Sequence, residues 1–139
     1  MLDKALAAAG MARDEVFLTN VVKHFHFSGT RGKQRIHKSP SPWHVTACEP
    51  WLIAELALVR PVGVVLLGAT AGAAVHGSSF RLGPNRGELQ PWPTEIAQPP
   101  DWVLATSHPS AVLRSRRRAE DLDALVADLD VARSALSTA

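Results

Sequence analysis

Three short apolar runs, separated by helix-like stretches, constrain the fold more than any other feature of the sequence. Residues 16–22 (VFLTNVV), 61–67 (PVGVVLL) and 102–106 (WVLAT) are rich in branched residues and carry no charge. Continuous runs of this kind are typical of strands buried on both faces of a parallel sheet. Because they alternate with helices, we predict an α/β fold with right-handed crossovers and a mostly parallel central sheet.

Helix signals surround these runs. Residues 1–9 are strong helix formers followed by Gly10, although no Ser, Thr, Asp or Asn precedes them as an N-cap. Residues 42–58 begin with proline and keep an apolar helical spacing that only Pro50 interrupts. A closing helix is predicted over about residues 118–136.

The segment between the second and third apolar runs is less regular. A short helix of small residues is predicted to end at Gly77, and residues 78–100 are rich in Gly and Pro. Within this stretch, residues 80–82 and 88–90 carry weak strand signals.

The length and composition fit one folded domain. The chain has 139 residues, of which 46% are hydrophobic and 20% charged. No apolar run approaches the about 18 residues of a membrane span, and no signal-peptide pattern follows Met1. The single cysteine excludes an internal disulfide, so we expect a soluble cytoplasmic protein without membrane contact.

Positive charge is concentrated in two segments, although the net charge is only +2. Residues 31–38 contain four Arg or Lys without a carboxylate, and residues 114–118 contain four arginines. Such clusters on a nearly neutral protein indicate a phosphate-bearing partner. Two solvated basic loops are the simpler alternative.

Polar segments follow each apolar run. Ligands of parallel sheets bind outside the carboxyl ends of the strands, which selects residues 20–37, 68–70 and 107–110. We therefore expect these segments at one edge of the sheet. The basic segment 31–40 has no hydrophobic period and is expected to be a long functional loop.

Histidines in two of these segments could do chemistry. Arg35 and Lys38 flank His37 and disfavour its imidazolium, so a neutral, nucleophilic or basic ring is expected; an exposed loop histidine is the alternative. His108 precedes proline at a strand end and faces the presumed cleft. Ser110 could cap the next helical turn and leave N–H groups for a phosphate, or simply complete a strand-to-helix turn.

Three further residues are candidates for binding. Asn20 lies within the first apolar run, where a buried carboxamide could read a planar ligand edge such as a pyrimidine or be a satisfied core amide. His24 and Cys48 bracket the basic segment and could be two ligands of a metal or iron–sulfur site. No CxxC pair completes such a site, and a buried helix cysteine is the alternative.

Together these segments resemble the uracil-DNA glycosylase superfamily, specifically its iron–sulfur branch and the UdgX type within it. The resemblance covers nearly the whole chain and rests on residues 19–25 (TNVVKHF), 33–37 (KQRIH), 66–70 (LLGAT) and 107–110 (SHPS). It implies a three-layer α/β sandwich with a mostly parallel sheet. It also implies that residues 1–139 form a single domain whose N-terminal part, with the first strand, is absent.

The resemblance further implies a role for each candidate. His37 corresponds to a histidine that attacks the deoxyribose C1′ after uracil departs, which leaves a covalent protein–DNA adduct. His108 would stabilise negative charge on the leaving uracil, and Asn20 would read the uracil edge. The residues implied to lie against the DNA are Lys33, Arg35, Pro109 and Ser110.

The implied cofactor is a [4Fe–4S] cluster with His24 and Cys48 as two of its four ligands. The Gly-Glu-x-Pro-Gly type motif and the cysteine pair of the family do not occur in this chain. The expected partner is uracil-containing DNA, preferably single-stranded, bound by a monomer that excises uracil in DNA repair. A catalytically impaired nucleic-acid-binding α/β domain is the alternative, and a generic phosphate-ligand domain is a third interpretation.

Overall fold

The computed structural model describes residues 1–21, 27–31, 34–37 and 42–139, although the side chains of residues 27–31, 34–37, 42 and 44 lie outside the description. The helical elements in these ranges are α1 (Leu2–Ala8), the 3-10 turn η1 (Arg13–Glu15), α2 (Pro42–Val59), α3 (Ala69–His76), α4 (Leu82–Asn85), α5 (Pro109–Arg114) and α6 (Arg118–Ser137). The strands are β1 (Phe27–Arg31), β2 (Gln34–His37), β3 (Gly63–Leu67), β4 (Leu89–Gln90) and β5 (Trp102–Thr106).

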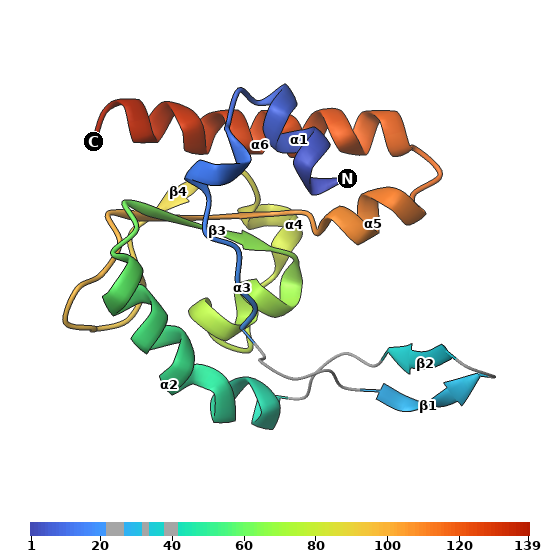
Figure 1. Cartoon of the computed structure of the whole chain (residues 1–139), viewed down its shortest axis with the longest axis horizontal. Helices are drawn as coiled ribbons and strands as arrows, with labels where there is room; N and C mark the ends of the chain where they lie inside the picture. Colours follow the sequence, from blue (N-terminus) through green and yellow to red (C-terminus); the bar gives the residue numbers. More distant parts are fainter. Residues whose placement is uncertain (22–26, 32–33, 38–41) are drawn as a thin grey trace.

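The central sheet is built around β5, which lies between β3 and β4. β3 runs parallel to β5 in a continuous register from Gly63 opposite Trp102 to Leu67 opposite Thr106, whereas β4 is antiparallel. Helices α1 and α6 lie on one side of this sheet and α2 and α3 on the other (Figure 1). The predicted α/β class is confirmed, and the described central sheet is small and mixed, with one parallel and one antiparallel pair.

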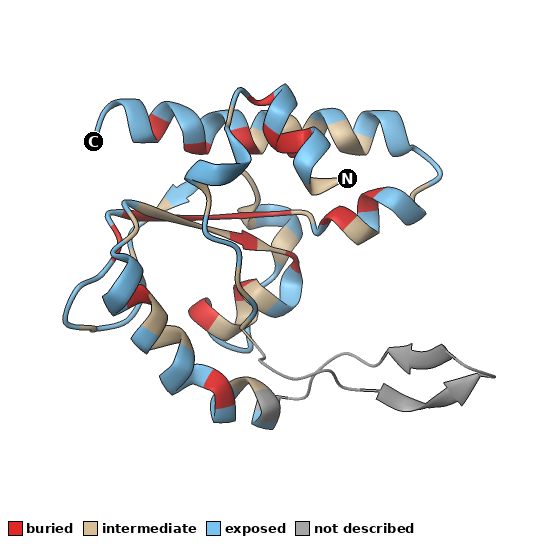
Figure 2. Cartoon of the chain, viewed as in Figure 1, coloured by how far each residue is buried: buried red, intermediate tan, exposed pale blue. Residues whose placement is uncertain are grey.

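Alternating side chains of β5 pack into hydrophobic clusters on both faces of the sheet. Val103 and Ala105 pack in a buried cluster with Leu66 of β3 and Val75 of α3. Trp102 and Leu104 point the other way and pack against α6. All of β5 is buried, and it forms a continuous red strand in Figure 2. This two-sided burial explains why residues 102–106 read as an uninterrupted apolar run.

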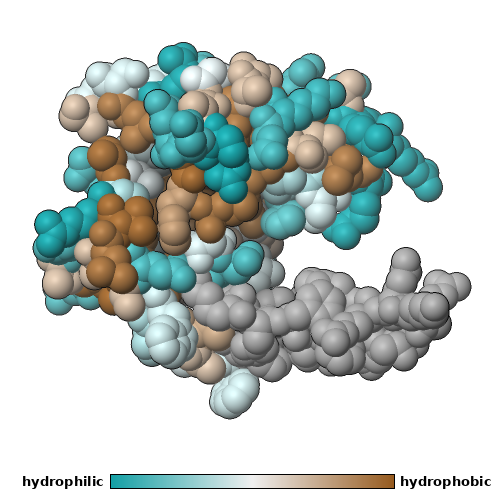
Figure 3. Space-filling view, viewed as in Figure 1, coloured by the Kyte–Doolittle hydropathy of each residue, from teal (hydrophilic) through white to brown (hydrophobic). Residues whose placement is uncertain are grey.

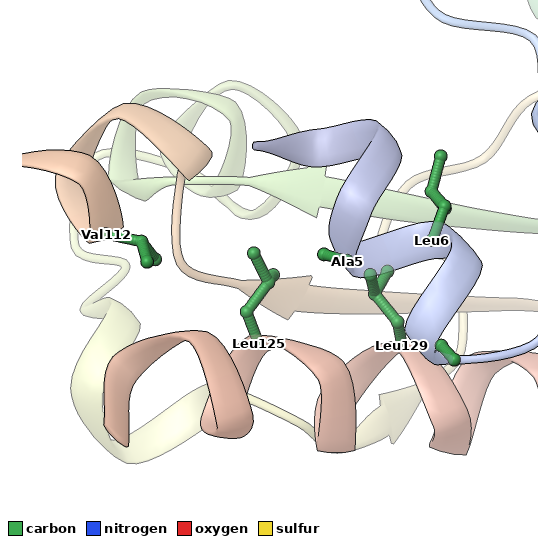
Figure 4. Packing of buried hydrophobic residues seen from close by; sticks show 6 residues of the cluster. Ala5, Leu6, Val112, Leu125 and Leu129 are labelled. Atoms are coloured by element: carbon green, nitrogen blue, oxygen red, sulfur yellow. The ribbon is translucent and has the colours of Figure 1, made fainter. Parts of the chain in front are cut away.

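A third cluster joins the N-terminal helix to the last one. Leu125 and Leu129 of α6 belong to one buried cluster with Ala5 and Leu6 of α1 and Val112 of α5, and in Figure 4 both leucines point from α6 toward α1. Full burial of a leucine side chain contributes about 1.5–3 kcal/mol, so these contacts are a main source of stability. They fix α1, α5 and α6 as one layer.

The predicted helices form close to their expected bounds. α1 begins at Leu2 without a side-chain cap and ends before Gly10, whose φ of 75° closes the helix. α2 continues through Pro50, and α3 ends at Gly77. Within the described residues, we find no helix that is both long and apolar enough to cross a membrane.

The expected buried strand at residues 16–22 is wrong for the described part of that run. Residues 16–20 form no strand, and the side chains of Phe17 and Leu18 are 60% and 50% exposed. Val16 packs against the α1–α6 cluster. Because residues 16–20 make no ladder with β3, their apolar side chains lack the two covering layers of a buried strand.

The basic segment is also more regular than the expected loop. β1 and β2 pair antiparallel as a separate two-stranded sheet, with Phe27 opposite His37 and Thr30 opposite Arg35. Two short runs separated by two residues are a hairpin signal that the basic composition obscured. The strand expected at residues 80–82 is likewise wrong, because α4 begins at Leu82, whereas the one at 88–90 is confirmed as β4.

Gly63 offers a test of the β3–β5 packing. A Cβ at Gly63 would lie 2.1 Å from Cε2 of Trp102, so Gly63→Ala forces the indole to move. We expect the free energy of unfolding in urea to fall by about 1–3 kcal/mol. Gly83→Ala in α4 is the control, because nothing lies within 4 Å of its Cβ, and it should be neutral or slightly stabilising. Equal stability of the two variants would contradict this packing.

Candidate functional site

The carboxyl ends of β3 and β5 meet, as expected for polar segments that follow parallel strands. The Gly68 N–H donates to the carbonyl oxygen of Thr106 at 2.8 Å. A Cβ added at Gly68 would lie 3.1 Å from Cβ of His108. With a φ of 93°, Gly68 adopts a conformation that favours glycine. The turn after β3 therefore passes directly against the histidine that follows β5.

His108 is the N-cap of α5, and its own ring makes the capping contact. Nδ1 accepts the backbone N–H of Ser110 at 3.0 Å and lies 2.7 Å from the Ser110 hydroxyl oxygen. A backbone N–H can only donate, so Nδ1 holds a lone pair and the ring proton is on Nε2. The expectation that Ser110 caps this turn and leaves its N–H for a phosphate is therefore wrong.

Two effects keep the His108 ring neutral. Partial burial lowers the pKa of His108 from its ordinary 6.5, and the positive charge of Arg114 lowers it further. The side chain still has an exposed part, so a ligand can reach it. A neutral ring with hydrogen on Nε2 can donate to an oxygen that gains negative charge, which is the chemistry of an oxyanion-stabilising group.

A partly buried polar network lies at the strand end that precedes His108. The Thr106 hydroxyl donates a hydrogen bond to Oδ2 of Asp128 at 2.5 Å. The same oxygen accepts hydrogen bonds from Nε and Nη2 of Arg86 at 3.1 and 2.7 Å. Thr106 is fully buried. The network ties β5 to α6 and to the end of α4. Sequence reasoning missed Arg86 and Asp128, because residues 42 positions apart carry no local signal of pairing.

The neighbouring residues of the SHPS segment have distinct places. Pro109 is buried at the first position of α5, where its ring fixes the helical start. Ser110 is half-buried and holds the His108 ring. In this chain, both residues therefore act on the orientation of His108.

Asn20 is exposed, so the buried carboxamide that its apolar neighbours indicated is not found. The preceding residue, Thr19, donates its hydroxyl hydrogen to Oε2 of Glu55 in α2 at 2.7 Å. This bond anchors the segment to the α2 side of the sheet. The carboxamide of Asn20 is accessible to a ligand from solvent.

The remaining candidates fall largely outside the described residues. His24 and Lys33 lie in undescribed ranges. Arg35 and His37 are placed in β2 by their backbone, and their side chains are outside the description. The structure brings together Gly68, His108 and Ser110, while the position of the His37 ring relative to them stays a prediction.

The donor set of the chain does not fit a complete iron–sulfur cluster. A [4Fe–4S] cluster takes four protein ligands, usually cysteines, and this chain has one cysteine. Cys48 is buried in α2. No group of three His, Cys, Asp or Glu side chains suited to a metal occurs in the described part of the chain.

One surface hollow of the described residues lies away from this chemistry. It has a volume of about 510 Å³ and is lined by the segment that precedes β5, including Trp92, Glu95 and Asp101. His108 follows the opposite end of β5. Proximity of polar groups, and not cavity size, therefore identifies the candidate site.

The protonation of His108 can be tested by NMR titration of the histidine rings. We expect a midpoint below 6.5 with the Nε2–H tautomer, and Arg114→Gln should raise it by removing a nearby positive charge. Because the folded-state pKa is lowered, His108 also makes stability fall as the pH drops below 6.5. His108→Gln assigns the resonance and Arg133→Gln is the control. A midpoint at or above 6.5 would refute this account.

Comparison with known proteins identifies the family of the chain. A sequence model of the Uracil DNA glycosylase superfamily matches residues 1–130. Type-4 uracil-DNA glycosylases from Thermotoga maritima and Pyrobaculum aerophilum are 30% and 29% identical over 122 and 116 residues. These alignments cover 84% and 82% of this chain but 54% and 55% of the relatives, so the chain spans about half their length. The chain belongs to the uracil-DNA glycosylase superfamily.

Proposed function

We propose that this protein excises uracil from DNA by cleaving the bond between uracil N1 and deoxyribose C1′. The observation that carries the proposal is the His108 ring, whose Nδ1 accepts the Ser110 N–H at the meeting point of β3 and β5. Membership in the superfamily and the Type-4 uracil-DNA glycosylases among its relatives support the same chemistry. DNA, preferably single-stranded, is the proposed partner, and the protein is proposed to act as a monomer.

His108 acts on the leaving group in this mechanism. When the glycosidic bond breaks, its electron pair moves into uracil and negative charge collects on a ring carbonyl oxygen. A hydrogen bond from Nε2–H of His108 to that oxygen lowers the barrier, and loss of one such donor costs about 10²–10³ in rate. The uracil anion then takes a proton from water. Because Ser110 occupies Nδ1, the ring is already oriented with its proton outward.

We propose that His37 traps the sugar, as in the UdgX type. The oxocarbenium-like C1′ is an electrophile, and a neutral imidazole nitrogen can attack it while the ring releases its other proton to solvent. The product is a covalent protein–DNA adduct. His37 lies in β2 of the β1–β2 pair, and Arg35 and Lys33 are proposed to contact phosphates. Asn20 is proposed to read the uracil edge.

A denaturing gel with a uracil-containing oligonucleotide tests both steps. We expect a retarded protein–DNA band with the wild-type chain and no band with His37→Ala. His108→Gln should slow uracil release by about 10²–10³. His76→Gln is the matched control, because His76 stacks on Phe80 and has no role in the proposed chemistry. An oligonucleotide with thymine in place of uracil should give no band.

The results of this gel experiment distinguish three functions for the site: covalent trapping, uracil release alone, and nucleic-acid binding without catalysis. Uracil release without a retarded band would refute the covalent step and leave the glycosylase intact. An undiminished band from His37→Ala would assign the adduct to another residue. Salt-sensitive binding that ignores uracil, with no base release, would refute glycosylase activity and favour a nucleic-acid-binding domain without catalysis.

For the cofactor, we propose ligand positions only. His24 and Cys48 are proposed as two of the four ligand positions of a [4Fe–4S] cluster, which this chain cannot complete with its own cysteines. After anaerobic incubation with ferrous iron and sulfide, we expect no complete cluster to stay on the chain through gel filtration. Four iron and four sulfide per monomer, lost in Cys48→Ser, would contradict this expectation.

A further inference from the structure

Two glycines with almost the same backbone conformation flank α3. Gly68, the N-cap residue, has φ 93° and ψ 172°, and Gly77, the C-cap residue, has φ 104° and ψ 168°. A residue with a side chain is strained in this conformation, so the backbone alone favours glycine at both positions. A Cβ at Gly77 would meet nothing within 4 Å, whereas a Cβ at Gly68 would lie 3.1 Å from Cβ of His108. Gly68 therefore meets a second constraint that Gly77 does not.

Gly68 borders one edge of the His108 side chain. Next after Cβ of His108, the atoms nearest to an added Cβ would be Cδ2 and Cγ of the same histidine, both at 3.7 Å. Ser110 contacts the other edge of the ring, where Nδ1 accepts its N–H at 3.0 Å. The imidazole is therefore held between the glycine on its Cδ2 edge and the serine on its Nδ1 edge. Because Nε2 is bonded to Cδ2, the proposed donor atom is next to the edge that Gly68 borders.

The backbone on both sides of this contact is fixed. The Gly68 N–H donates to the Thr106 carbonyl oxygen at 2.8 Å, and the Gly68 carbonyl oxygen accepts the N–H of Gly72 at 3.1 Å. The His108 carbonyl oxygen accepts the N–H of Ala111 at 3.0 Å in the first turn of α5. Carbon atoms in ordinary contact lie about 3.5–4.0 Å apart. A side chain at position 68 would therefore displace His108 by a few tenths of an ångström.

The histidine in this contact stays open to a ligand. His108 is exposed, and hydrophilic side chains project around α5, the helix that starts directly after it, in Figure 3. Contact with the turn after β3 therefore restricts the position of the ring without burying it.

We propose that Gly68 is a positioning residue for uracil excision, because the absence of a side chain there lets His108 reach the place from which Nε2–H donates to the leaving uracil. The inference rests on the proposed function. It separates two tasks: Gly68 determines where the β-carbon of the histidine lies, and Ser110 determines how the ring is turned. Donors to a developing oxyanion act at about 2.7–3.1 Å, so a displacement of a few tenths of an ångström is enough to weaken this donor.

Gly68→Ala and Gly77→Ala form a matched pair that separates positioning from backbone strain. Both substitutions place a β-carbon on nearly the same strained backbone at an end of α3, and only the first also meets His108. We expect both variants to lose thermal stability, by about 5–10 °C. The two variants are therefore compared at a low temperature at which circular dichroism shows both to be folded.

Single-turnover release of uracil from a single-stranded oligonucleotide is the functional measurement, with the protein in excess. The limiting rate of Gly68→Ala should fall by about 10-fold, while the protein concentration at half of that rate changes by less than about threefold, because the donor is misplaced and the binding surface is intact. Gly77→Ala should stay within about twofold of the wild type, because it carries the strain without the contact. Equal rates for the two variants would overturn the proposal.

NMR tests the same contact without requiring activity. In the wild type, an α-proton of Gly68 should show an NOE to the β-protons of His108, and its absence would overturn the proposal even if Gly68→Ala does not fold. In folded Gly68→Ala, the N–H proton resonance of Ser110 should move upfield as its hydrogen bond to Nδ1 weakens. The same resonance should not move in Gly77→Ala. An unchanged Ser110 resonance in Gly68→Ala would contradict the positioning role.

Failure of this inference is distinguishable from failure of the proposed function. If the wild type releases no uracil, the glycosylase proposal is refuted, and the Ser110 resonance still decides whether Gly68 positions the histidine. If the wild type releases uracil and the two variants have equal rates, the role of Gly68 is refuted and the glycosylase proposal stands.

Discussion

The parallel pairing of β3 with β5 is the interaction on which the rest of the structure depends. It is in register over all five residues of each strand, from Gly63–Trp102 to Leu67–Thr106. Hydrogen bonds of this ladder bring both strand ends to the same level, so the Gly68 turn closes against His108. A slip of one residue would turn Val103 and Leu104 to the wrong faces and separate the two polar turns.

Polar contacts hold the residues at and beyond the end of this ladder. Thr106 is bonded to Asp128, Asp128 to Arg86, and two residues beyond Thr106 the His108 ring is bonded to Ser110. The first two contacts hold the end of β5, and the contacts with Ser110 define one orientation and one tautomer of the His108 ring. A preorganised donor of this kind avoids reorganisation during the reaction, which is the main advantage of such groups over water.

Much of the scaffold could be predicted from the sequence, because burial on both faces leaves a local signature. β5 and α6 match their expected ranges closely, since their apolar patterns follow from packing on each side. Residues 16–20 were misleading for the same reason: an apolar run indicates burial only when layers exist to cover it. The β1–β2 hairpin was hidden by its basic composition.

The site was predictable in its residue types and less so in its contacts. His108 and Ser110 could be singled out, but the direction of their hydrogen bond, with the histidine capping the helix, depends on backbone geometry that no local pattern encodes. Arg86 and Asp128 meet only through the tertiary fold. For Asn20 the sequence suggested too much: its apolar neighbours indicated a buried side chain, and the residue is exposed in the structure.

Because the capping ring is also the proposed hydrogen-bond donor to the leaving uracil, the lifetime of the first turn of α5 limits the reactive geometry. α5 has six residues, and helices of this length fray unless tertiary contacts hold them. Opening of that turn would release Nδ1, allow the ring to rotate and exchange tautomers, and leave the core intact. Activity would then be lost on warming before the global transition, through a local opening that spectroscopic probes of the whole fold do not detect.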